Sequence, residues 1–318
     1  MQQRLLGNTG LSVSILSYGA SPLGSVFRDV DESEGIVCVH RALELGINLI
    51  DCSPYYGLTK AETVLGRALQ GVPRDAYYLA TKVGRYGPDF PDFDFSAARV
   101  TRSIDESLAR LGVEHLDIIQ CHDVEFGDLN QIVEETIPAL RRAVEAGKSR
   151  FVGITGLPLH VFTEVASRVP IDTVLSYCRY SLNDASLSQI LPFLSQKGIG
   201  VIGASPLSMG LLTSRGAPDW HPAPDAVKIA CRRAVEHCEA RGASIEKLAV
   251  QFSVSHPQIA STLVGTANPK NIEKNIAWAQ EPLDEQLLSE VQAILAPVQN
   301  QTWLSGHPEN NDPQMVTN

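Results

Sequence analysis

Features that would place the protein outside a reducing, aqueous compartment are missing from the sequence. The six cysteines form no CxxC pair and mostly lie in apolar stretches, so a disulfide framework is not expected. No apolar run approaches the length of a membrane span, and the N-terminal segment lacks the basic region and apolar core of a signal peptide. We therefore expect a cytoplasmic protein with reduced, buried thiols. A redox-sensitive site at Cys52 and Cys121 stays open as an alternative, because each lies beside a candidate functional residue.

Positive charge is also scarce. The chain has 26 Lys and Arg residues against 36 Asp and Glu, a net charge of -10, which argues against nucleic acid or an anionic membrane as a partner. The hydrophobic content of 44% is typical of a globular protein of enzyme size. We expect a small-molecule substrate as the partner, and a monomer or weak homo-oligomer.

Several catalytic motifs are absent. No Walker A, HExxH or GxSxG pattern occurs, so phosphoryl transfer, zinc proteolysis and nucleophile-elbow hydrolysis lack support, and no metal is expected. One GxGxxG match runs from Gly198 to Gly203, but a dinucleotide loop needs a strand before it and a helix after it. Here a helical pattern precedes the glycines and a strand-like run follows, so we interpret Gly198 as a helix cap.

The chain instead alternates strand-like and helix-like segments. Apolar runs recur near residues 15–19, 48–51, 77–82, 116–122, 151–153, 173–176, 200–204 and 262–265. Helical spacing occupies residues 34–45, 61–69, 96–111, 129–146, 158–168, 185–197, 226–241, 245–256, 269–279 and 284–295. This order predicts an α/β protein, a single (β/α)8 TIM barrel spanning residues 1–318, with extra helices near the C-terminus. Two doubly wound domains are the alternative.

Four segments lie outside this repeat. Residues 3–13 carry a Gly-Asn-Thr-Gly turn and predict an N-terminal β-hairpin that plugs the bottom of the barrel. Residues 83–95 and 205–224 are too long for plain connections and are expected to overhang the opposite end as lids or pocket walls. Residues 298–318 form a C-terminal tail expected near that same face.

Polar residues with complementary chemistry follow three successive predicted strands: Asp51 and Tyr56, then Lys82, then His122. Because the carboxyl ends of parallel strands share one face of a barrel, these side chains are expected to meet. An ammonium stabilises a phenolate and lowers the pKa of the phenol, a carboxylate holds the ammonium, and a neutral imidazole orients a substrate oxygen. Each residue alone is more often structural, but together they suffice for hydride transfer with a nicotinamide.

The motifs D-x4-Y-G at residues 51–57, ATK at residues 80–82 and the strand-ending His122 resemble the aldo-keto reductase superfamily. The resemblance covers nearly the whole chain. It implies that Asp51, Tyr56, Lys82 and His122 form a catalytic tetrad, with Tyr56 and His122 also contacting substrate. Tyr56 matches the family tyrosine better than Tyr55, since the pattern places it five residues after the aspartate and before a glycine.

Longer strings are similar to the L-galactose dehydrogenase branch of that family, among them FVGITGLPL, LSYCRYSLND and NQTWLSG. This likeness implies NAD-dependent oxidation of L-galactose at C1 to L-galactono-lactone. Trp303 and the aromatic residues before Ser96 are expected to wall the sugar pocket, with ordinary packing as the alternative.

The resemblance also implies the cofactor contacts. These fall on Gly19, Ala20, Thr155, Ser176, Ser205, Leu207, Gly210, Thr266, Asn271 and Asn275. Relatives that prefer NADP grip its 2′-phosphate with a lysine and an arginine, whose positions here hold Gly265 and Asn271. Only Lys270 remains nearby, so NAD is the expected cofactor.

Three other functions remain open. Two are enzymatic: NADPH-linked reduction of an aldehyde, and oxidation of another aldose such as L-fucose. The third is a cofactor-sensing regulatory subunit, because barrels resembling this family also serve as channel-associated subunits.

Overall fold

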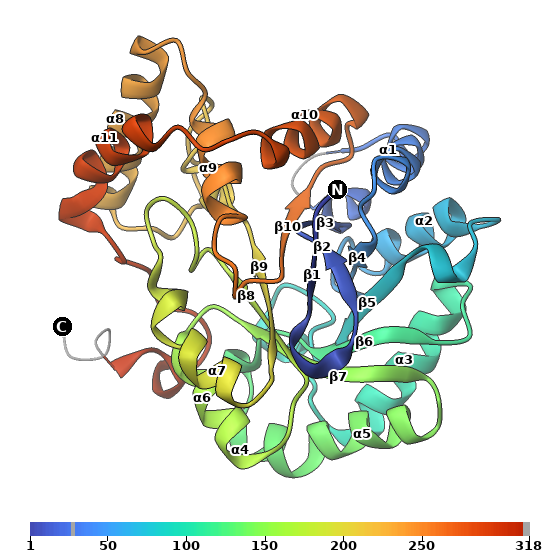
Figure 1. Cartoon of the computed structure of the whole chain (residues 1–318). Helices are drawn as coiled ribbons and strands as arrows, with labels where there is room; N and C mark the ends of the chain where they lie inside the picture. Colours follow the sequence, from blue (N-terminus) through green and yellow to red (C-terminus); the bar gives the residue numbers. More distant parts are fainter. Residues whose placement is uncertain (27–28, 314–318) are drawn as a thin grey trace.

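The computed structural model describes residues 1–26 and 29–313, and these form a closed parallel barrel (Figure 1). Its eight strands run in sequence order around the barrel, and β10 closes it by pairing with β3. The strands are β3 (Leu16–Gly19), β4 (Leu49–Asp51), β5 (Tyr78–Val83), β6 (Leu116–Cys121), β7 (Ser149–Gly156), β8 (Thr173–Tyr177), β9 (Gly200–Ala204) and β10 (Ser261–Gly265). The predicted (β/α)8 fold is confirmed.

Helices surround the barrel and mostly match the predicted ranges (Figure 1). They are α1 (Glu32–Glu44), α2 (Lys60–Leu69), α3 (Ala97–Leu111), α4 (Leu129–Gln131), α5 (Ile137–Glu145), α6 (Leu159–Arg168), α7 (Leu191–Gln196), α8 (Asp225–Ala240), α9 (Ile245–Ser253), α10 (Pro269–Gln280) and α11 (Glu285–Leu295).

Two predicted helices are interrupted. The segment 129–146 contains a wider π-helical stretch at Ile132–Thr136, and the segment 185–197 begins with a 3₁₀ turn at Ser186–Gln189. Proline explains both differences. Pro138 and Pro192 lack an N–H and crowd the preceding turn, so the regular α-helical hydrogen-bond pattern cannot run through these positions.

The N-terminal hairpin is present as β1 (Gln3–Leu5) paired with β2 (Ser12–Ser14). Leu6, Leu11 and Val13 are fully buried or nearly so, in a cluster with inward-facing residues of the barrel strands. The hairpin meets the amino end of β9, where Asn8 N donates to Gly198 O at 2.8 Å. It therefore covers the amino end of the barrel and leaves the carboxyl end for a site.

The GxGxxG match lies at this covered end. Gly198 follows α7 with a φ of 71°, and Gly200 begins β9. A left-handed residue after a helix is a common C-terminal cap, as the sequence predicted for Gly198. The glycines thus serve the turn from helix to strand.

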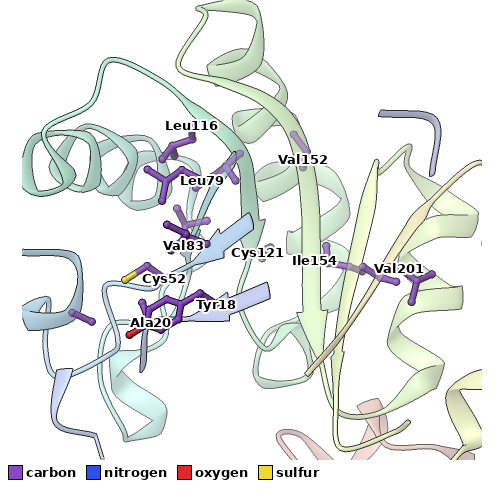
Figure 2. Packing of buried hydrophobic residues seen from close by; sticks show 14 of the residues in the cluster. Tyr18, Ala20, Cys52, Leu79, Val83, Leu116, Cys121, Val152, Ile154 and Val201 are labelled. Atoms are coloured by element: carbon purple, nitrogen blue, oxygen red, sulfur yellow. The ribbon is translucent and has the colours of Figure 1, made fainter. Parts of the chain in front are cut away.

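Most of the core lies between the strands and the surrounding helices. Figure 2 shows this cluster, with Tyr18, Val83, Cys121 and Ile154 among the buried side chains on neighbouring strands. A second cluster joins α8, α9 and α11 to the segment that contains Trp303.

All six cysteines are free and buried, as predicted. Burial raises the pKa of the Cys52 and Cys121 thiols well above the usual range, which opposes formation of the reactive thiolate at both positions. In the described ranges no helix is long and apolar enough to cross a membrane.

Candidate active site

The four residues predicted from the strand ends lie together at the carboxyl end of the barrel. Lys82 Nζ donates to Asp51 Oδ1 and lies 3.3 Å from the Tyr56 hydroxyl oxygen. The rings of Tyr56 and His122 meet edge to face, with centroids 5.9 Å apart. An acid, an ammonium, a phenol and an imidazole therefore share one buried site.

The strand register explains how the site forms. Neighbouring residues of a strand face opposite sides, so residues two apart share a face. Leu49, Ala80 and Ile118 belong to the cluster inside the barrel, and the residues two positions later are Asp51, Lys82 and Gln120. Three adjacent strands thus place an apolar layer inside the barrel and, two residues further along each strand, a polar layer at its carboxyl end.

Gln120 is a member of this polar layer that the sequence analysis missed. Its Nε2 donates to Asp51 Oδ2 at 2.7 Å, which leaves one carboxylate oxygen of Asp51 for Lys82 and one for Gln120. The signal was a polar residue two positions before His122 in a predicted strand.

Tyr56 lies in a turn that depends on a close approach of two backbone segments. Gly57 has a φ of 63°, and a Cβ placed on it would lie 2.0 Å from the carbonyl oxygen of Gly24. Any side chain would force the turn away from the loop after β3. Gly57 therefore holds the Tyr56 side chain over Lys82.

Burial and charge act in opposite directions on the Tyr56–Lys82 pair. Burial opposes the charged form of Lys82, but Asp51 and Tyr56 more than offset this and raise the pKa of Lys82 above its usual range. Burial also raises the pKa of Tyr56 to about 12, although Lys82 acts to lower it. Lys82 thus acts on the pKa of Tyr56 in the predicted direction, and the loss of hydration acts against it and is the larger effect.

His122 is a neutral imidazole in this site. Burial lowers its pKa to about 3, and Lys82 and Arg85 add to the effect while Asp123 opposes it. Its Nδ1 lies 3.1 Å from Ser53 Oγ, and its Nε2 lies 3.7 Å from Asp123 Oδ2. A neutral ring can donate one hydrogen bond and accept one.

A second ion pair beside the tetrad also escaped the sequence analysis. Arg85 Nη1 donates to Asp123 Oδ2 at 2.6 Å, and its guanidinium lies 3.8 Å from the centroid of the Tyr55 ring. Phe93 and Phe126, which stack on each other, lie within 6 Å of the same guanidinium. Asp123 directly follows His122 and Arg85 follows Lys82 by three residues, so proximity in sequence could have identified them.

The predicted cofactor residues lie at or after the carboxyl ends of five strands. Gly19 and Ala20 end or follow β3, and Thr155 and Ser176 lie near the ends of β7 and β8. The other six occupy the loop after β9, the loop after β10 and helix α10: Ser205, Leu207, Gly210, Thr266, Asn271 and Asn275.

Three features of this arc bear on the predicted cofactor contacts. Ser176 Oγ is buried without a hydrogen-bond partner among the described residues, so a polar ligand group could satisfy it. Ser205, Ser208, Met209 and Gly210 in the loop after β9 have positive φ, and the N–H groups of Ser208 and Gly210 donate within this loop to the Ser205 and Leu207 carbonyl oxygens. The N-terminus of α10 follows the last strand, the usual place for a phosphate in this fold.

Thr155 differs from the other cofactor candidates because its hydroxyl is already engaged. It donates to Asp123 Oδ1 at 3.1 Å and accepts from the Asp123 N–H at 2.9 Å. Thr155 therefore holds Asp123, the residue after His122, by two hydrogen bonds. The contact of Thr155 with the cofactor stays a prediction.

Trp303 is 9% exposed and lies in the second hydrophobic cluster. Its ring meets His221 edge to face at 5.1 Å, and His221 Nε2 bonds to Ser208 O at 3.0 Å. Trp303 therefore packs the tail against the loop after β9, and its contact with sugar stays a prediction.

The tail contacts loops that follow strands β6 and β8, and it binds Glu125, which lies in the loop that starts at His122. Ser305 Oγ donates to Glu125 Oε1 at 2.9 Å, and the N–H of His307 donates to the Glu125 carbonyl at 2.9 Å. Asp312 Oδ2 accepts from Arg179 at 2.9 Å. The last part of the predicted tail, residues 314–318, lies outside the described residues.

Glu125 generates a prediction on stability. Burial raises the pKa of this carboxyl from an ordinary 4.5 to about 8, with Asp123 adding to the shift. The folded protein therefore retains a proton that the unfolded chain loses, so this group's contribution to stability falls as pH rises from about 4.5 to about 8. We expect Tm to fall less over this range in Glu125→Gln than in the parent protein, as measured by thermal unfolding.

The control for that experiment is Glu236→Gln, which neutralises an exposed glutamate on α8. It should follow the pH profile of the parent protein. An unchanged pH profile in Glu125→Gln would contradict a proton held on Glu125.

Comparison with known proteins agrees with this geometry. A model of the Aldo/keto reductase family matches residues 15–296. The chain is 52% identical over 319 residues to an L-galactose dehydrogenase of Arabidopsis thaliana, covering 98% of this chain and 99% of that protein. It is 28% identical to a D-threo-aldose 1-dehydrogenase of Pseudomonas sp, covering 85% and 90% of the two chains. Among solved structures it resembles the aldo-keto reductase AKR11C1 from Bacillus halodurans, with a TM-score of 0.78, 25% identity, and coverage of 96% and 99%.

Proposed function

The chain belongs to the aldo/keto reductase family, and from that premise we propose that it is an NAD-dependent dehydrogenase that oxidises L-galactose at C1 to L-galactono-lactone. The observation that supports this most is the 3.3 Å contact between the Tyr56 hydroxyl and Lys82 Nζ, beside a neutral His122. The choice of sugar rests on the near full-length similarity to the Arabidopsis L-galactose dehydrogenase.

The tetrad divides the work of the reaction. NAD⁺, when bound, supplies the acceptor for the hydride that leaves C1 of the cyclic sugar. Tyr56, in its phenolate form, would take the proton of the C1 hydroxyl as the hydride leaves C1, and the bond between C1 and its oxygen would become a lactone carbonyl. Lys82 stabilises the phenolate, and Asp51 holds Lys82 with Gln120 behind it. His122 donates a hydrogen bond to the C1 oxygen.

The surroundings of Arg85 and Asp123 suit a polyhydroxylated substrate. A carboxylate accepts hydrogen bonds from hydroxyl groups, a guanidinium donates them, and aromatic rings pack against the C–H faces of a sugar. Asp123 lies beside His122 and Arg85 lies over the Tyr55 ring, so we expect this ion pair to meet the hydroxyls near C1. An aldose fits these groups better than a simple aldehyde.

The cofactor would lie across the loops after β8, β9 and β10. Ser176 would satisfy its buried hydroxyl on the nicotinamide amide, and the loop at residues 205–210 would lie beside the pyrophosphate. Gly265 and Asn271 offer no positive charge to a 2′-phosphate, which favours NAD over NADP.

The proposed reaction is tested by a panel of aldoses with purified protein. We expect NADH, followed by its absorbance, to form with L-galactose and NAD, and more slowly with L-fucose and other aldoses. Efficient turnover of a different aldose would reject L-galactose as the preferred substrate but would still support the oxidation of an aldose with NAD. Absence of NADH with every sugar would reject the dehydrogenase and favour the cofactor-sensing subunit.

Tyr56→Phe tests the assigned base. Removing the phenolic oxygen removes the proton acceptor, so turnover should fall on the order of 100-fold or more. Binding of NAD, followed by quenching of protein fluorescence, should stay nearly unchanged. Tyr55→Phe is the matched control, because it removes a neighbouring phenol outside the tetrad. Near-normal turnover in Tyr56→Phe would refute the role of Tyr56.

The cofactor preference is tested by the ratio of kcat/KM with NAD and with NADP. We expect the ratio to favour NAD by about tenfold or more, because the 2′-phosphate lacks a cationic partner. Asn271→Arg should shift the ratio toward NADP. A preference of the parent protein for NADP would contradict the assignment.

A further inference from the structure

Ser53 is a fully buried residue between Asp51 and the tyrosine turn that the reaction above does not use. It is 0% exposed. Its Oγ lies 3.1 Å from His122 Nδ1 and accepts the N–H of Tyr55 at 3.1 Å. The hydroxyl thus contacts one member of the tetrad, His122.

The hydrogen bonds of Ser53 determine which partner donates. A serine hydroxyl has one proton to donate and two lone pairs to accept with. The Tyr55 N–H can only donate, so it occupies one lone pair. Among the described residues the remaining partner of Oγ is His122 Nδ1, and a buried hydroxyl is destabilised when its proton has no acceptor. The proton of Ser53 therefore points at Nδ1, which must be the unprotonated nitrogen.

The contact on the Nε2 side of the His122 ring favours the same tautomer. Nε2 of His122 lies 3.7 Å from Asp123 Oδ2, and Asp123 is held there by Arg85 and Thr155. A protonated nitrogen beside a carboxylate is attracted to it, whereas a lone pair would be repelled. Two independent contacts on opposite sides of the ring thus favour the same tautomer.

We propose that Ser53 is a positioning residue that donates a hydrogen bond to His122 Nδ1 and keeps this imidazole in the Nε2–H tautomer, with its donor toward the substrate oxygen. The inference deepens the proposed function and rests on it for its catalytic consequence.

That consequence concerns the division of roles between His122 and Tyr56. In the Nε2–H tautomer, His122 can only donate to the C1 oxygen, so the C1 hydroxyl proton goes to Tyr56. In the opposite tautomer, a lone pair of His122 would accept the hydroxyl proton as a hydrogen bond and turn it away from Tyr56. Ser53 would therefore affect turnover more than binding.

The tautomer is measured directly by nitrogen NMR of the protein labelled at its eight histidines. His122→Gln identifies the signals of this ring by their loss. We expect a protonated Nε2 and an unprotonated, hydrogen-bonded Nδ1 in the parent protein. In Ser53→Ala the Nδ1 signal should shift toward that of a nitrogen without a hydrogen bond. A protonated Nδ1 in the parent protein, or an Nδ1 signal unmoved in Ser53→Ala, would overturn the proposal.

Kinetics of the same variants test the consequence. Ser53→Ala should lower kcat on the order of tenfold or more, with little change in the KM for sugar or in NAD binding. Ser53→Thr retains the hydroxyl and should recover part of the loss. Ser253→Ala is the matched control, because Ser253 is equally buried but donates to a carbonyl of its own helix, α9. An equal loss of kcat in Ser53→Ala and Ser53→Thr, or in Ser253→Ala, would indicate a merely structural role.

The NMR and kinetic measurements distinguish failure of the proposed role of Ser53 from failure of the proposed reaction. The NMR measurement needs neither sugar nor turnover, so it decides the role of Ser53 even if L-galactose is not oxidised. A protonated Nδ1 in a protein that oxidises L-galactose would refute the role of Ser53 alone. The expected tautomer in a protein that oxidises no aldose would uphold the hydrogen bond and refute the proposed reaction.

Discussion

A lysine ammonium inside the barrel is the constraint on which the rest of the site depends. Lys82 is 1% exposed, and a buried charge is tolerated only when it is paired and hydrogen-bonded. Asp51 and the Cys52 carbonyl accept from it, and Gln120 fixes the second oxygen of Asp51. Since these groups come from three adjacent strands, the pairing register of the barrel and the position of the charge support one another.

A neutral ring separates two ion pairs at the barrel mouth. Lys82 with Asp51 lies on one side of the site, and Arg85 with Asp123 lies on the other. His122 stays uncharged between them because burial and the two cations oppose its protonation. With its charges arranged in this way, the site can polarise a substrate oxygen through a neutral imidazole. It also presents both a hydrogen-bond donor and an acceptor to hydroxyl groups.

The N-terminal hairpin and the C-terminal tail contact opposite ends of the barrel by different means. The N-terminal hairpin fills the amino end with leucine and valine side chains, which removes that end from function. At the opposite end, the C-terminal tail makes polar contacts with Glu125 and Arg179. A carboxyl held by several hydrogen bonds in a dry environment makes this attachment sensitive to pH, whereas the apolar hairpin has no such dependence.

Local patterns determined the order of strands and helices, the hairpin, the helix cap at Gly198 and the four residues of the tetrad. They could do so because strand periodicity and turn residues are short-range signals, and because parallel strands bring their carboxyl ends together whatever their exact pairing. The tertiary structure alone decided the contacts that depend on register and loop path: Gln120 behind Asp51, Arg85 against Tyr55, Ser53 against His122, and Trp303 packed on His221. It also decided that burial outweighs Lys82 in setting the pKa of Tyr56, because the loss of hydration depends on every group packed around the phenol and not on its neighbours in the sequence.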